Sequence, residues 1–219
     1  MSPKFDSVAV VGAGTMGSGI AHVFALHGHD VTLIDAQPVA LERGRQAIGK
    51  NLERQVAKEA ITAEERDAAL SRIAPAGELD AAHAADLVVE AIVEDESVKV
   101  DVLRTLDAIV QPDGILASNT SSISITRLAA ATSRPDQFVG MHFMNPVPVM
   151  KLVEVIRGLQ TSDDVTAAVM ETARALGKEP VAVNDFPGFV SNRVLMPMIN
   201  EAVFCLMEGV AEAEAIDTV

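Results

Sequence analysis

The feature that most constrains the fold is a glycine-rich segment near the N-terminus, Gly12-Ala13-Gly14-Thr15-Met16-Gly17. An apolar, β-branched run at 8–11 comes directly before it, and apolar residues at helical spacing follow it. Gly12 permits a tight turn, Gly14 allows a phosphate to approach the backbone, and Gly17 allows the helix to lie close to the strand. Free amide groups of the first helical turn, at Thr15 and Met16, would then face the phosphates. The segment predicts a strand–turn–helix unit that binds a dinucleotide.

The second predicted strand, 31–34, is followed directly by Asp35, at the spacing expected for a ribose ligand. Its carboxylate can accept hydrogen bonds from both hydroxyls of the adenosine ribose but would repel a 2′-phosphate. Ala36 and Gln37 offer no guanidinium to bind such a phosphate. We therefore expect NAD rather than NADP. The alternative is a purely structural glycine turn followed by an exposed carboxylate.

Short β-branched runs alternate with longer helical patterns along the chain. The predicted strands are 8–11, 31–34, 87–91, 115–117, 138–142 and 152–156, with a weaker one at 181–183. This alternation predicts an α/β, Rossmann-type, doubly wound and mostly parallel sheet. The composition agrees, because 49% hydrophobic and only 3% aromatic residues suit buried strands under Ala-rich helices.

A long helical insertion follows the second strand, from Pro38 to about Lys58. Thr62 and Glu65 then form a capping box that opens another helix. Because the pair is longer than a crossover needs, we expect a helical hairpin that projects from the sheet as a wall for a ligand. Four basic residues share one stripe of the first helix: Arg43, Lys50, Arg54 and Lys58. They could bind phosphates, although a solvated basic face has the same spacing.

The composition changes at 184–188, where a Pro-Gly turn ends the sheet region. We predict a nucleotide-binding domain at 1–184 and the beginning of an all-α domain at 185–219. Residues 189–208 have a helical pattern, although Pro197 should kink it. Because one helix and the start of another cannot form a core of their own, we expect this second domain to be incomplete in the chain.

Two residues on consecutive predicted strands could form a catalytic pair. His142 ends the strand 138–142, and Glu154 lies within 152–156, where an ionised carboxylate is costly unless it is paired. An imidazole could remove the proton of an alcohol near neutral pH, and a carboxylate could fix its tautomer. Each residue also has a structural explanation by itself, so the residues alone leave the pairing open.

Charge and cysteine content exclude several classes of function. A net charge of −14 argues against a nucleic-acid or membrane binder, because the field of the protein repels polyanions. The single cysteine cannot form an internal disulfide, and no Cys/His cluster could hold a metal. We therefore expect a protein without a metal. Because no apolar run has the length of a membrane span, we also expect it to be cytoplasmic.

Four segments in the same order resemble the (S)-3-hydroxyacyl-CoA dehydrogenase family, and most closely its bacterial 3-hydroxybutyryl-CoA members. They are the glycine segment 12–17, Ser-Asn-Thr-Ser-Ser at 118–122, the run from Met141 to Glu154, and Pro-Gly-Phe-Val-Ser-Asn-Arg at 187–193. The resemblance covers essentially the whole chain.

The resemblance implies a role for individual residues. It makes His142 the general base, Glu154 its partner, Ser121 a ligand of the substrate oxygen, and Asn192 a contribution from the second domain. The residues implied to line the cofactor site are Glu94, Lys99, Asn119 and Asn145. Those implied to contact CoA are Lys58, Arg54 and Asn51, the last in place of a serine that commonly stands there. Structural alternatives are helix caps for Ser121 and Asn192 and surface charges for Glu94 and Lys99.

The predicted function is the reversible, NAD-dependent oxidation of an (S)-3-hydroxyacyl-CoA, 3-hydroxybutyryl-CoA in particular, to the 3-oxoacyl-CoA. The resemblance also implies a homodimer in the full-length protein. One alternative is a related NAD-dependent dehydrogenase of a non-CoA hydroxy acid, and another is a non-catalytic NAD-binding protein. The basic stripe favours CoA over the first alternative, and the intact catalytic residues argue against the second.

Overall fold

The computed structural model describes residues 5–219 and contains one 8-stranded sheet. Its strands are β1 (Ser7–Val11), β2 (Asp30–Ile34), β3 (Ile73–Ala76), β4 (Leu87–Glu90), β5 (Ile115–Ser118), β6 (Phe138–Phe143), β7 (Leu152–Arg157) and β8 (Glu179–Asn184). They lie in the order β3-β2-β1-β4-β5-β6-β7-β8. Only the β6–β7 pairing is antiparallel, so β7 and β8 run against the other strands. The predicted doubly wound, mostly parallel sheet is confirmed.

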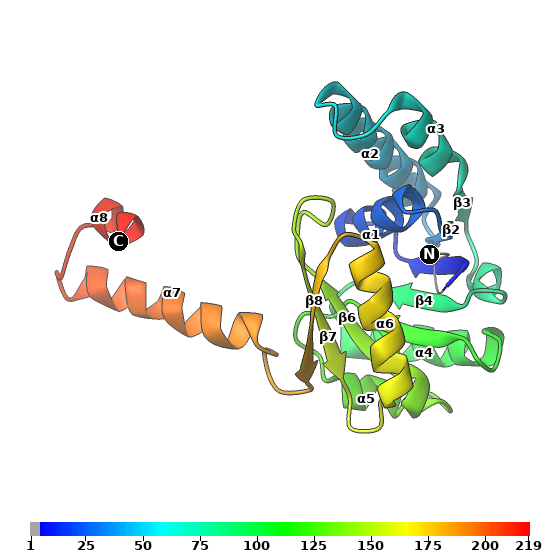
Figure 1. Cartoon of the computed structure of the whole chain (residues 1–219). Coiled ribbons are helices and arrows are strands. Elements are labelled where there is room, and N and C mark those ends of the chain that lie inside the picture. Colours follow the sequence, from blue (N-terminus) through cyan, green and yellow to red (C-terminus); the bar gives the residue numbers. More distant parts are fainter. Residues whose placement is uncertain (1–4) are drawn as a thin grey trace.

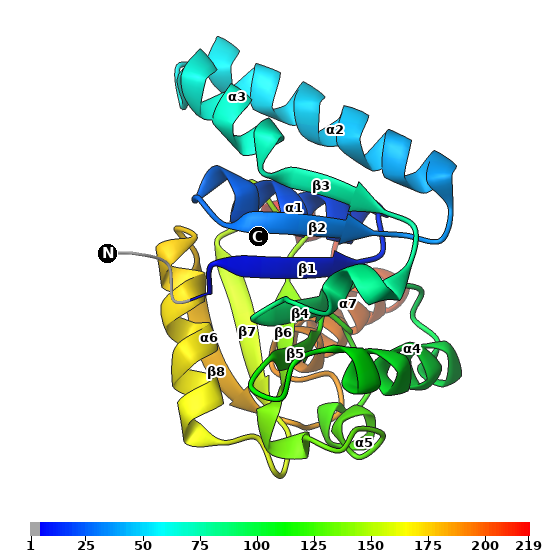
Figure 2. The ribbon, with the colours of Figure 1, turned by 90° about the vertical axis from the view of Figure 1, so that its right-hand side faces the viewer.

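Helices cover both faces of the sheet (Figures 1 and 2). The helices of the described residues are α1 (Thr15–Leu26), α2 (Pro38–Ala57), α3 (Ala63–Ser71), α4 (Glu96–Ile109), α5 (Ile125–Ala129), α6 (Asp163–Ala175), α7 (Ser191–Met207) and α8 (Ala213–Thr218), with short 3₁₀ turns at Leu79–Ala82 and Pro135–Gln137. One core holds Phe24 of α1 and Val169 of α6, and the other holds Leu103 of α4 and Leu128 of α5. The molecule is therefore a three-layer α/β structure.

The edge strand β3 is absent from the strands predicted above. Its sequence, Ile-Ala-Pro-Ala, has no β-branched alternation, and Pro75 lacks the N–H that an inner strand needs. At the edge of the sheet this residue is tolerated, because β3 pairs with β2 on one side only. Strand β3 is recognisable only from its pairing with β2.

The predicted helical hairpin consists of α2 and α3, which lie against α1 and project beyond the sheet (Figure 1). The capping box at its turn is confirmed. The Thr62 hydroxyl accepts a hydrogen bond from the Glu65 amide at 3.1 Å, and the Glu65 carboxylate accepts one from the Thr62 amide at 2.7 Å. These bonds satisfy amide groups that the first turn of α3 leaves free.

The last two helices, α7 and α8, extend away from the sheet (Figure 1). Helix α7 continues through Pro197, and most of its side chains are exposed. Between residues 5 and 219, no helix is both long and apolar enough to cross a membrane.

Candidate active site

The largest of the pockets described here, of about 760 Å³, lies where β1, β2 and β4 end, at the point where the strand order reverses. Gly12, with φ +103°, borders it, and a Cβ there would come within 2.6 Å of the Ala91 carbonyl oxygen. A Cβ on Gly17 would lie 1.7 Å from the Gly12 oxygen, so α1 can approach the strand only without one. By contrast, a Cβ on Gly14 would meet nothing within 4 Å. The turn therefore leaves open space beside its backbone, as the approach of a phosphate requires.

Asp35 lines the same pocket from the end of β2, together with Thr15 and Met16. One carboxylate oxygen accepts a hydrogen bond from the Ala13 amide at 2.8 Å, and the other accepts one from the Gln37 amide at 2.9 Å. These bonds hold the carboxylate beside the glycine turn. Among the described residues that line this pocket, none is Lys or Arg.

His142 and Glu154 face each other because β6 and β7 are antiparallel and pair these two residues in register. The His142 Nδ1 atom lies 2.9 Å from Glu154 Oε2. The other ring nitrogen, Nε2, lies 3.1 Å from the Ser121 hydroxyl. Both His142 and Glu154 are buried, whereas Ser121 is exposed. The structure thus links the three side chains in one hydrogen-bonded series that ends at the protein surface.

The Glu154 carboxylate also binds the beginning of α7. Its Oε1 accepts the backbone amides of Val190 and Ser191 at 3.0 and 2.9 Å, and its Oε2 accepts the Ser191 hydroxyl at 2.7 Å. Burial favours the neutral acid, but the hydrogen bonds from His142, Ser191 and Val190 outweigh this effect and lower the pKa of Glu154 to about 2. The group is therefore a carboxylate at neutral pH.

The loop after β5 brings Ser121, Glu94 and Asn192 together. The Asn192 side-chain amide donates to the Ser121 carbonyl at 3.0 Å, and the Ser121 amide donates to Glu94 Oε1 at 2.9 Å. Burial raises the pKa of Glu94, but hydrogen bonds from Thr120 and Ser121 and the charge of Lys99 lower it overall. Neither Ser121 nor Asn192 is a helix cap, because the N-cap residue of α5 is Ser124 and that of α7 is Val190.

Lys99 is not a surface charge, since only 1% of it is exposed. Its Nζ lies 2.6 Å from the buried carboxylate of Glu90 and 3.4 Å from that of Glu94. Glu90 also accepts a hydrogen bond from the Ser118 hydroxyl at 2.6 Å. Sequence reasoning missed Glu90, although a carboxylate that ends the apolar strand Leu-Val-Val-Glu was a usable signal. The pair supports the loop that carries Ser121.

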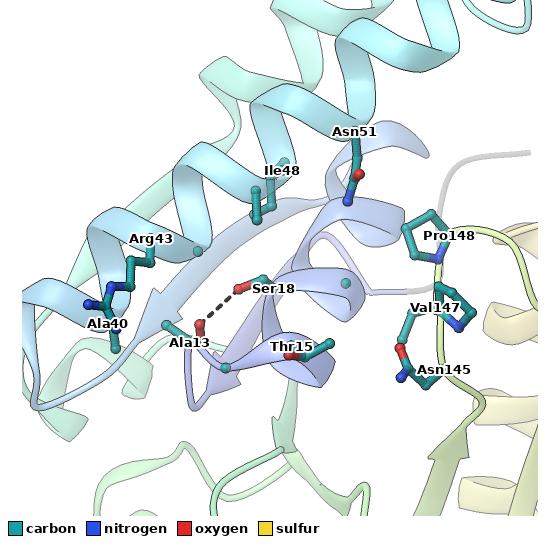
Figure 3. A pocket seen from close by; sticks show the side chains of 15 residues that line it. Ala13, Thr15, Ser18, Ala40, Arg43, Ile48, Asn51, Asn145, Val147 and Pro148 are labelled. Atoms are coloured by element: carbon teal, nitrogen blue, oxygen red, sulfur yellow. Dashed lines mark hydrogen bonds between the residues drawn. The ribbon is translucent and has the colours of Figure 1, made fainter.

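Two asparagines flank this region. Asn119 directly follows β5, and its side-chain oxygen Oδ1 accepts a hydrogen bond from the Phe143 amide at 2.9 Å. Asn145 lines a different pocket, of about 400 Å³, in which α2 forms one wall and the segment 145–148 forms the other (Figure 3). Gly14 and Thr15 border this pocket as well, so it adjoins the glycine turn.

A further pocket of about 290 Å³ lies along α2 and is lined by Asn51, Arg54 and Lys58. Arg43 lines the 400 Å³ pocket, whereas Lys50 lines neither of the two. Most of the basic stripe therefore borders cavities. Over residues 5–219, no cluster of three or more His, Cys, Asp or Glu side chains has an arrangement that could hold a metal ion.

Comparison with known proteins identifies the family. The model of the 3-hydroxyacyl-CoA dehydrogenase NAD binding domain matches residues 7–186, and that of the C-terminal domain of the same enzymes matches residues 188–219. The chain belongs to the 3-hydroxyacyl-CoA dehydrogenase family. The predictions of an oxidoreductase and of NAD as its cofactor are confirmed.

Several similar proteins are named 3-hydroxybutyryl-CoA dehydrogenase. A 3-hydroxybutyryl-CoA dehydrogenase of Bradyrhizobium diazoefficiens is 52% identical over 217 residues, which are 99% of this chain and 74% of that protein. One of Clostridioides difficile is 46% identical over 96% of this chain and 75% of its own length. The crystal structure of (S)-3-hydroxybutyryl-CoA dehydrogenase from Ralstonia eutropha superimposes with a TM-score of 0.94, at 50% identity over 96% of this chain and 75% of that chain.

Proposed function

We propose that the protein catalyses the reversible, NAD-dependent oxidation of (S)-3-hydroxybutyryl-CoA to the 3-oxoacyl-CoA. The observation that carries this proposal is the series Ser121–His142–Glu154, with contacts of 3.1 and 2.9 Å. Pockets that border the glycine turn and the basic stripe support it. The names of relatives at 46–52% identity support the choice of acyl-CoA.

In this proposal His142 is the general base. Because Glu154 is ionised and can only accept hydrogen bonds, it selects the tautomer that carries the proton on Nδ1. The lone pair of Nε2 then faces Ser121 and can take the proton of the substrate's 3-hydroxyl group. The imidazolium that results is stabilised by the Glu154 charge. In the reverse direction, His142 returns this proton to the 3-oxo group.

Ser121 and Asn192 orient the substrate oxygen in our proposal. The Ser121 hydroxyl already lies within hydrogen-bond distance of the base, so it can share the same substrate oxygen. Asn192 holds the Ser121 backbone from the first turn of α7, and Glu94 holds it from the other side. Three separate segments of the chain therefore fix one serine, which restricts where the reacting oxygen can bind.

The residues present fit NAD, because Gly14 leaves open space at its backbone and Asp35 offers a carboxylate in a pocket without basic residues. Gly12, Gly14, Thr15, Met16, Gly17 and Asp35 would hold it, with Glu94, Lys99, Asn119 and Asn145 as further contacts. When bound, NAD accepts the hydride from C3 of the substrate.

Lys58, Arg54 and Asn51 would hold the CoA portion, because they line one pocket along α2. We retain three further proposals. The change in composition supports a domain boundary between residues 184 and 185, the resemblance supports a homodimer in the full-length protein, and the charge and cysteine content support a cytoplasmic location without nucleic-acid partners. Size-exclusion chromatography with light scattering tests the homodimer.

The decisive experiment measures NADH oxidation with acetoacetyl-CoA, with longer 3-oxoacyl-CoAs and with free acetoacetate. We expect turnover of acetoacetyl-CoA and little turnover of the free acid. Preference for the free acid would favour a dehydrogenase of non-CoA hydroxy acids. Binding of NADH without turnover of any of these compounds would favour a non-catalytic NAD-binding protein.

A further inference from the structure

The loop of residues 144–151, between β6 and β7, is a wall that two pockets share. Residues 145–148 line the pocket of about 400 Å³ beside the glycine turn (Figure 3), and Pro146, Pro148 and Val149 line the pocket of about 290 Å³ along α2. None of the described residues of this loop lines the pocket that contains Asp35. The conformation of the loop therefore sets the shape of the two pockets that face α2. The loop does not border the pocket that contains Asp35.

A buried lysine holds this loop from behind. Lys178 lies between α6 and β8 and is 8% exposed. Its Nζ donates hydrogen bonds to the carbonyl oxygens of Val147 and Met150, at 2.5 and 2.9 Å. The loop's own turn is closed by the amides of Val149 and Met150, which both donate to the Pro146 carbonyl. Lys178 thus binds the backbone on both sides of a turn that the loop forms by itself.

The opposite side of the turn rests on α1. Val147 is 2% exposed and lies against Gly19, where an added Cβ would come within 2.9 Å of the Val147 Cβ. The turn is therefore confined between α1 and the Lys178 amine, and it has little room to shift while both contacts are made.

Burial of the Lys178 amine has a cost in folding free energy. Burial lowers the pKa of Lys178, and among residues 5–219 no carboxylate forms an ion pair with it. An ammonium without a counter-charge in a buried position destabilises the fold unless strong hydrogen bonds compensate. Here the compensating bonds go to the carbonyls of one loop only, so the lysine acts on the shape of that loop.

We propose that Lys178 is a positioning residue for acyl-CoA binding, which holds the loop 144–151 in the shape that both pockets along α2 require. This inference rests on the proposed binding of CoA in the pocket that Asn51, Arg54 and Lys58 line. Substitution of the lysine by methionine keeps the length of the side chain and removes its donors and its charge.

Steady-state kinetics test the proposal. Because a displaced loop weakens binding equally in the ground state and the transition state, we expect Lys178→Met to raise the KM for acetoacetyl-CoA about tenfold, with kcat within about threefold. The Kd for NADH should also change by no more than about threefold, because Asn145 is the one residue of this loop that we place against NAD and Lys178 binds the loop at Val147 and Met150 instead. The control is Lys151→Met, at the end of the same loop, where the side chain is 72% exposed and only 3.7 Å from the equally exposed Glu179. An unchanged KM in folded Lys178→Met, or an equal rise in the Kd for NADH, would overturn the inference.

Hydrogen exchange gives a readout that does not depend on activity. We expect the amides of Val149 and Met150 to exchange at least about tenfold faster in Lys178→Met, while the Ser18 amide, which bonds to Gly14 in α1, is unchanged. Unchanged exchange in the loop would overturn the role of Lys178, whether or not the wild type is active. Failure of the wild type to reduce acetoacetyl-CoA would count against the proposed function and not against the role of Lys178. If Lys178→Met does not fold, Lys178→Gln, which keeps a shorter donor, is measured with the same two outcomes.

Discussion

Replacing Glu154 by glutamine removes the charge beside His142 and keeps the shape of the side chain. The pKa of Glu154 falls from 4.5 to about 2 in the structure, which corresponds to roughly 3 kcal/mol of extra stabilisation of the anion. Hydrogen bonds from His142, Ser191 and Val190 share this stabilisation, and His142 makes the largest of these contributions. Because the stabilisation is shared, we assign to the pair only part of it, on the order of 1–2 kcal/mol, which predicts a loss in kcat of about 5- to 30-fold.

The assay is the rate of NADH oxidation at saturating acetoacetyl-CoA, with the Kd for NADH measured in parallel by fluorescence. Glu179→Gln is the matched control, because it makes the same chemical change on the neighbouring strand β8, where the side chain is 72% exposed. We expect that control to retain the wild-type kcat, since an exposed ion pair contributes little.

A double-mutant cycle then tests whether the two residues act as one unit. His142→Gln alone should lower kcat by roughly 10²- to 10⁴-fold, and adding Glu154→Gln should lower it little further. A kcat for Glu154→Gln within about threefold of wild type would refute the reasoning, as would losses that multiply in the double variant.

Four further predictions have defined outcomes. Asp35→Ser should weaken NADH binding on the order of tenfold and erode the preference over NADPH; better turnover with NADPH in the wild type would contradict the cofactor assignment. Lys58→Ala should raise the KM for acetoacetyl-CoA by an amount equivalent to about 1–3 kcal/mol. Lys50→Ala should leave that KM unchanged, because Lys50 lines neither pocket along α2. Equal effects of the two substitutions would show that the basic stripe is a solvated face. Lys99→Met should lower the free energy of unfolding in urea by roughly 3–5 kcal/mol, because it leaves a buried carboxylate unpaired. Because the pKa of Glu154 is lower in the folded state than its ordinary 4.5, the advantage of wild type over Glu154→Gln in unfolding free energy should be complete above that pH and disappear as the pH falls towards about 2; a difference independent of pH would show that the charge does not stabilise the fold.

Features that depend on neighbours in the chain were predictable from the sequence. The glycine turn, Asp35 at the end of the second strand, and the capping box of Thr62 and Glu65 each consist of residues close together, and the structure has all three. Local patterns work here because a turn or a cap is stabilised by bonds within a few residues. The alternating strands and helices likewise predicted the doubly wound sheet.

Tertiary structure alone decided which distant groups meet. The sequence left the pairing of His142 with Glu154 open, and the antiparallel register of β6 and β7 places them opposite each other. Strand β3 forms because β2 offers it a free edge, and its residues carry no strand pattern. Lys178 appears in the sequence as an ordinary lysine after a helix, yet it is buried against a loop about 30 residues away. Burial and pairing over such distances depend on how whole elements pack, and no local pattern of residues encodes that geometry.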